Sequence, residues 1–122
     1  MKELQIAGTK KAPALRYLNG HFSIEGCSIP EDPKKYFKPV LSFFEDNSNY
    51  MAEKYLIEIK FEYCDSSSLK WILNILMEIQ KHVLFSNTEI KWYYESDDAE
   101  MMELGEFVSQ RIKLPFMLID VD

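Results

Sequence analysis

The stretch from Lys54 to Leu76 changes its hydrophobic period at a short polar cluster, and this change limits the folds open to the chain. In "KYLIEIKFEYC" alternate positions are apolar, which predicts a β-strand over 54–63 whose buried face holds Tyr55, Ile57, Ile59, Phe61 and Tyr63. After "DSSS" the apolar residues recur every three or four positions, which predicts an amphipathic helix over 67–85. A strand that leads directly into a helix is the first half of a β-α-β unit.

The rest of the carboxy-terminal half repeats this order. "TEIKWYYE" predicts a second strand, the acidic stretch from Asp98 to about Arg111 predicts a helix, and "FMLIDV" predicts a last strand. Because crossovers between strands of one sheet are right-handed, this alternation predicts parallel pairing. The carboxyl ends of such strands are where functional groups gather, and Asp65-Ser66-Ser67 lies at one of them.

The amino-terminal half predicts a hairpin and one more helix. Leu4 and Ile6 begin a short strand, and Asn19-Gly20 between two alternating runs predicts a two-residue turn with positive φ at both positions. Asp32-Pro33 is typical of a helix start, although Pro39 predicts a break or kink further along. Residues 1–122 are thus expected to form one α/β domain, a mixed sheet with a hairpin, a parallel β-α-β-α-β unit and packed helices.

Composition narrows the function classes. The chain has 14 Lys and Arg against 20 Asp and Glu, a formal charge of −6, and its basic residues are dispersed. Nucleic acid and anionic membranes are therefore not expected as partners. Cys27 and Cys64 show no disulfide or metal-ligand spacing, and the first residues lack the apolar core of a signal peptide, so we expect a cytoplasmic protein.

The Asp65-Ser66-Ser67-Ser68 cluster permits two interpretations. Aspartate and serine satisfy the unpaired N–H groups of a first helical turn, so capping alone explains one of these residues. The remaining hydroxyls stand at the positive end of a helix dipole, where a phosphate is stabilised by backbone N–H groups while Asp65 repels it. Both interpretations stay open on residue chemistry.

Catalysis has less support in the sequence. The serines lack the flanking glycines of a hydrolase nucleophile turn, no orienting partner is evident for His21 or His82, and no glycine-rich phosphate loop occurs. We expect no cofactor and no metal. The rival hypothesis is a small ligand-binding protein or enzyme that uses a crevice lined by Asp65, Asp97 and Asp98.

The order of "FSIEGCSIPEDP", "YCDSSSLKWILNIL" and "WYYESDDAEMMELGEFVS" resembles the SiaC family of bacterial regulatory phosphoproteins over essentially the whole chain. This family is similar in logic and fold to STAS domains of anti-sigma factor antagonists, in which Asp-Ser-Ser between a strand and a helix carries the regulatory phosphoserine. The resemblance implies that Ser66 is the phosphorylation site, with Ser67 as second choice. Ser68 stands where the STAS motif continues with Gly.

The resemblance also implies a partner switch that catalyses nothing itself. A serine/threonine kinase adds the phosphate, a PPM-type metal-dependent phosphatase removes it, and the unmodified form binds an effector. A diguanylate cyclase is the expected effector, which links the protein to cyclic di-GMP and biofilm signalling. Asp65, Ser68, Trp71 and Ile75 are the expected contacts, although Trp71 and Ile75 alternatively pack under the neighbouring helix. The acidic segment 95–106 is either a docking surface or a solvated face.

Overall fold

The computed structural model describes residues 3–47 and 54–121, which form one mixed sheet with three α-helices on it. The strands are β1 (Glu3–Ile6), β2 (Ala14–Leu18), β3 (His21–Ser28), β4 (Tyr55–Cys64), β5 (Thr88–Glu95) and β6 (Phe116–Val121). The helices are α1 (Pro33–Asp46), α2 (Ser66–Gln80) and α3 (Ala99–Ser109), and the 3₁₀-helix η2 (Phe85–Asn87) precedes β5.

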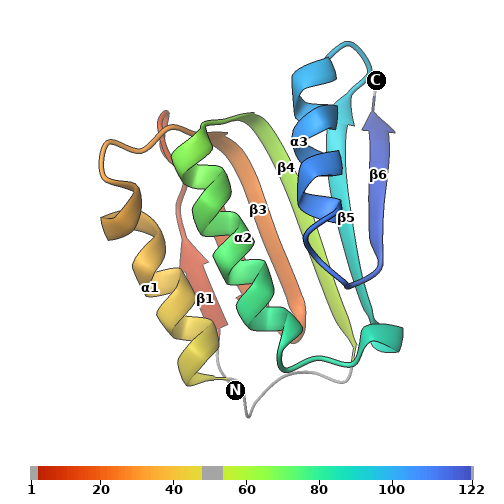
Figure 1. The fold of residues 1–122 in the computed structure, drawn as a ribbon. Helices are drawn as coiled ribbons and strands as arrows, with labels where there is room; N and C mark the ends of the chain where they lie inside the picture. Colours follow the sequence, from red (N-terminus) through yellow and green to blue (C-terminus); the bar gives the residue numbers. More distant parts are fainter. Residues whose placement is uncertain (1–2, 48–53, 122) are drawn as a thin grey trace.

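The strand order in the sheet is the order along the chain. β1, β2 and β3 pair antiparallel, and β3, β4, β5 and β6 pair parallel. Because each right-handed crossover steps to the next strand in the same direction, all three α-helices lie on one face of the sheet (Figure 1). The predicted α/β class, with its hairpin and parallel unit, is confirmed.

The hairpin turn adopts the predicted geometry. Asn19 has φ 50° and Gly20 has φ 86°, and Leu18 pairs with His21 on either side of them. Positive φ at both central residues matches the right-handed twist of the flanking strands. The turn therefore sets the register of β2 and β3.

Helix α1 begins as predicted but does not break at its proline. The Asp32 carboxylate accepts the Lys35 N–H at 3.1 Å, and the helix continues through Pro39 to Asp46. Pro39 lies on the exposed side, where water can hydrate the carbonyl that loses its helical partner. The opposite side holds the helix on the sheet through three fully buried residues, Phe37, Val40 and Phe44.

Helix α2 ends at Gln80, earlier than the predicted residue 85. The N–H groups of Lys81 and His82 donate to the carbonyls of Glu78 and Ile79, which tightens the last turn and ends the helix. Val83 lies beyond this turn and packs against the core from the connecting segment. Val83 has the spacing expected of one more helical turn, so the hydrophobic period predicts a helix that is longer than α2.

Candidate functional site

Helix α2 begins directly at the carboxyl end of β4, and its first turn is held by Asp65. The Asp65 carboxylate accepts the Ser68 N–H at 2.8 Å, and the Asp65 N–H donates to the Ser28 carbonyl at 3.0 Å. A single cap of this kind satisfies the donor it reaches. Asp65 therefore does the capping without help from the serine hydroxyls.

The three serines occupy different surroundings. Ser66 and Ser67 are exposed, whereas Ser68 is fully buried. The Ser28 hydroxyl donates to the Ser68 hydroxyl at 2.7 Å, and the Ser68 hydroxyl donates to the Ser28 carbonyl at 3.2 Å. Ser68 thus ties α2 to the end of β3, and the prediction that it lies in the partner-binding surface is wrong.

Ile75 is also corrected, because it is fully buried. Figure 1 shows α2 as the middle helix, with α1 on one side and α3 on the other. A helix flanked on both sides buries a wider stripe than one seated at an edge, and Ile75 falls within that stripe. Ile75 belongs to the buried core, and Trp71 is partly buried and packs against that core.

A groove of about 520 Å³ runs between α2 and α3, and we call it the interhelical groove. Its apolar lining comes from Tyr63, Leu69, Leu73, Leu104 and Phe107. Ser66 and Lys70 line it from α2, and Glu100 and Glu103 line it from α3. Ser67 is not among the lining residues. The groove therefore combines a largely apolar surface, an acidic border and one exposed serine.

Two large aromatic side chains of this groove were missed by the sequence reasoning. Tyr63 was predicted to share the buried face of β4, but it is 50% exposed. Gly26 pairs with Phe61 and Cys27 pairs with Tyr63, so Glu62 is an extra residue that turns Tyr63 outward. Phe107 is 39% exposed beneath the Arg111 guanidinium, 3.5 Å from the ring centre. Gly26, at φ 115°, was the available signal for the bulge.

Cys64 lines the groove without offering a nucleophile. Burial raises the pKa of the Cys64 thiol to about 12, with the nearby Asp65 carboxylate adding to the effect. Since the reactive form is the thiolate, this side chain stays protonated at neutral pH. The groove is therefore suited to contact and not to covalent chemistry at this residue.

The three aspartates of the rival crevice do not form one site. Asp98 caps α3 by accepting the Met101 N–H at 3.0 Å, and it lines a cavity of about 450 Å³ with Lys60 and Tyr93. Asp65 does not line that cavity, and Asp97 is exposed. Within residues 3–47 and 54–121, no group of three or more His, Cys, Asp or Glu side chains is arranged to hold a metal ion.

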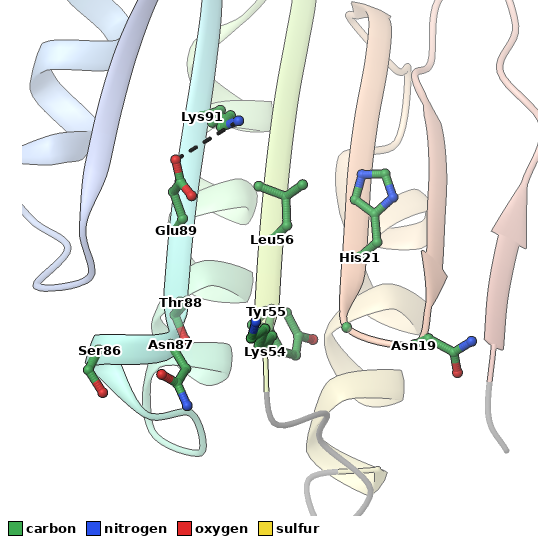
Figure 2. A pocket seen from close by; sticks show the side chains of 11 residues that line it. Asn19, His21, Lys54, Tyr55, Leu56, Ser86, Asn87, Thr88, Glu89 and Lys91 are labelled. Atoms are coloured by element: carbon green, nitrogen blue, oxygen red, sulfur yellow. Dashed lines mark ion pairs between the residues drawn. The ribbon is translucent and has the colours of Figure 1, made fainter.

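Another cavity, of about 490 Å³, lies at the opposite end of the sheet, near the hairpin turn and η2 (Figure 2). His21, Lys54 and Glu89 are among its lining residues. It opens at the amino ends of the parallel strands, whereas Ser66 follows the carboxyl end of β4. It is thus distinct from the interhelical groove.

The sheet face without helices carries a carboxylate with two partners. His21 Nε2 lies 2.8 Å from Glu58 Oε1, and the Tyr93 hydroxyl donates to Glu58 Oε2 at 2.5 Å. The Tyr93 hydrogen bond lowers the pKa of Glu58, with a smaller contribution from His21, and Glu58 raises the pKa of Tyr93 to about 12. The sequence did not make this partner of His21 evident, because it is strand pairing that brings Glu58 to it.

Known proteins resemble this chain over nearly its full length. The model of the family described as SiaC family regulatory phosphoprotein matches residues 6–121. An uncharacterized protein of Pseudomonas aeruginosa is 25% identical over 121 residues, which are 97% of this chain and 96% of that protein. No helix in the described part of the chain is long and apolar enough to cross a membrane.

Solved structures share the fold. SiaC of Pseudomonas aeruginosa superposes with a TM-score of 0.84 at 23% identity, over 99% of this chain and 100% of that one. The structure of the diguanylate cyclase SiaD in complex with its activator SiaC, from the same species, matches with a TM-score of 0.82 at 22% identity, over 97% of this chain and 99% of that one. The fold and the family match agree, and this chain belongs to the SiaC family of regulatory phosphoproteins.

Proposed function

We propose that the chain is a partner-switching regulator in which phosphate on Ser66 closes the interhelical groove to an effector. The position of Ser66 carries this proposal, because this side chain is exposed on the first turn of α2 and also lines the groove. Ser67 is exposed but lies outside the lining, and Ser68 is buried in its bonds to Ser28. Ser66 is thus the serine whose charge an occupant of the groove would meet.

The electrostatics of the groove support a loss of binding on phosphorylation. A phosphate brings about −1.5 to −2 charges at pH 7 to a border that already holds Glu100 and Glu103, next to Asp65. A partner that covers the apolar lining would have to desolvate this charge, and the groove lining offers only Lys70 to offset it. Affinity therefore falls unless the partner supplies basic residues at that point.

The same phosphate leaves the fold intact. It sits at the amino end of α2, where backbone N–H groups and the helix dipole favour negative charge. Lys70 lies one turn further along α2 and also lines the groove, so its ammonium group is within reach of the phosphate. The modification thus acts on binding rather than on stability, as a reversible switch requires.

The proposed partners follow the family. A serine/threonine kinase and a PPM-type phosphatase set the state of Ser66 in the cytoplasm, and the chain itself catalyses no reaction. A diguanylate cyclase is the proposed effector, and support comes from SiaC, which is the activator of the cyclase SiaD in the similar structure. Asp65, next to Ser66 in the chain, stays a candidate contact beside the groove, and Trp71, which is partly accessible but does not line the groove, stays a candidate contact on another side of α2.

Phosphosite mapping tests the assignment directly. The tryptic peptide "FEYCDSSSLK" is followed in protein isolated from its own host with phosphatases inhibited, and fragment ions separate the three serines. Phosphate on Ser66 is the expected result. Phosphate confined to Ser67, or none under several growth conditions, would contradict it.

Effector binding tests the consequence. Ser66→Ala should retain capture of the cyclase when the kinase is present, and Ser66→Asp should weaken it. Ser67→Asp is the matched control, because it adds the same charge one residue along and outside the groove lining. Equal affinity of the Ser66→Ala and Ser66→Asp proteins would rule out the switch.

A further inference from the structure

Strand β6 forms one border of the sheet. It pairs with β5, and within the described residues no strand pairs with its other side (Figure 1). The opposite border is β1, which has four residues against the six of β6. A border strand presents unpaired backbone groups to any chain able to pair with them.

The backbone hydrogen bonds between β5 and β6 show which residues of β6 face outward. The Ile90 N–H donates to the Pro115 carbonyl at 2.9 Å, and the Ser96 N–H donates to the Val121 carbonyl at 3.1 Å. Along a strand the backbone groups of successive residues point to opposite sides, so 117 and 119 also face β5. Phe116, Leu118 and Asp120 therefore direct their N–H and C=O groups away from the sheet.

The side chains of β6 lack the usual protection of a sheet border. Met117 is 49% exposed and Leu118 is 37% exposed, and the single charge of "FMLIDV" is Asp120, which accepts a hydrogen bond from the Ser96 hydroxyl. In β1, by contrast, Glu3 and Gln5 alternate with Leu4 and Ile6. Charged and polar side chains on a short border strand discourage pairing, and a longer apolar one favours it.

We propose that two copies of this chain associate through β6, paired antiparallel about a twofold axis at Leu118. This register uses all three outward-facing residues: Leu118 lies opposite the partner's Leu118, and Phe116 lies opposite the partner's Asp120. On the sheet face without helices, Met117 then meets the partner's Ile119. The central facing pairs, Leu118 with Leu118 and Met117 with Ile119, are apolar on both copies, so the middle of the strand matches itself, as a symmetric interface requires, and a second copy is the occupant.

The contact is small and is expected to be weak. A single pair of strands buries less than the roughly 800 Å² per partner that stable complexes use, so dimers form in a concentration-dependent manner. The residues that line the interhelical groove are not in β6, so pairing leaves both grooves open. A dimer therefore offers two grooves to a dimeric effector, which raises the apparent affinity through effective concentration.

Single cysteines test the register. In a hydrogen-bonded antiparallel pair the Cα atoms are about 5.5 Å apart, within the range of a disulfide, so Leu118→Cys should give a covalent dimer under mild oxidation. Met117→Cys is the matched control, because Met117 is more exposed but lies diagonally, about 7–8 Å, from the partner's Met117. Cross-linking of Met117→Cys as strong as that of Leu118→Cys would overturn the proposed register.

Sedimentation tests the association itself in the unmodified chain. The sedimentation coefficient should rise from a monomer value at low micromolar protein to a dimer value at high micromolar protein. In the Met117→Lys variant this rise should need at least a tenfold higher protein concentration. Gln5→Lys places the same charge on the other border strand and should leave the rise unchanged. A monomer at every concentration would refute the proposal, while Ser66→Asp, which tests the switch, should leave dimerisation as it is.

Discussion

Helices α2 and α3 start in the same way and differ in what their first turns expose. Each follows a parallel strand, and each has an aspartate cap that accepts the N–H three residues on, Asp65 at 2.8 Å and Asp98 at 3.0 Å. The first turn of α3 contains Glu100, whereas the first turn of α2 contains no acidic residue and two exposed serines. Because α3 is capped without serines, capping does not account for Ser66 and Ser67.

The largest expected effect distinguishes the first residue of α2, Ser66, from the first residue of α3, Ala99. Ser66→Asp and Ala99→Asp each add one negative charge to the residue after the cap, where the dipole accepts it. Ser66→Asp should weaken effector binding by about 2–3 kcal/mol, because the charge lies in the groove lining. Ala99→Asp should change it little. Calorimetry with the purified cyclase measures both, and an equal loss would remove the distinction between the helices.

The second effect concerns the contribution of the buried Ser68 to the free energy of unfolding. Ser68→Ala removes a partner of the Ser28 hydroxyl inside the core, and it should lower the free energy of unfolding by about 1–3 kcal/mol. Ser67→Ala, one residue earlier and exposed, should be nearly neutral. Urea denaturation of both variants gives the comparison. A neutral Ser68→Ala would mean that Ser28 finds another partner.

The caps themselves should behave alike. Asp65→Ala and Asp98→Ala should each cost about 1 kcal/mol of stability, since each removes one side-chain acceptor from a first turn. Asn in place of either aspartate should restore most of the loss, because it also accepts the N–H. Thermal unfolding of the four proteins is sufficient. A much larger cost at Asp65 would show that it does more than cap.

The smallest effect makes the first turn of α2 resemble that of α3. Ser67→Glu places a carboxylate at the position that Glu100 holds in α3, and it should add about 0.3–1 kcal/mol of stability at low salt. The gain should shrink as salt screens the charge. Denaturation at two ionic strengths measures it, and a salt-independent gain would point to a cause other than the dipole.

Local patterns predicted the elements well, because alternation and turn chemistry are properties of neighbouring residues. The Asn19-Gly20 turn and the ends of β5 and β6 were found this way. Tyr63 was misplaced, because the extra residue Glu62 is defined only by pairing with β3. Ile75 was misplaced for a similar reason, since its burial in the core depends on tertiary packing and not on its neighbours in the chain.

The candidate site was predictable in part. The position of the serines between β4 and α2 followed from the sequence, but their separate environments did not. The bond between Ser68 and Ser28 joins residues 40 positions apart, and the link between His21 and Glu58 spans 37. Such pairs depend on the strand register. The interhelical groove likewise exists because α3 is seated beside α2, which no local pattern contains.

The agreement between strand order and chain order has a consequence for synthesis. Each strand after β1 pairs with the strand that precedes it in the chain, so its partner has already been synthesised when it emerges. No strand must wait for a distant partner, and most pairings close only one helix and its connections. The sheet is therefore suited to form progressively in chain order, with β6 adding after the strands that precede it.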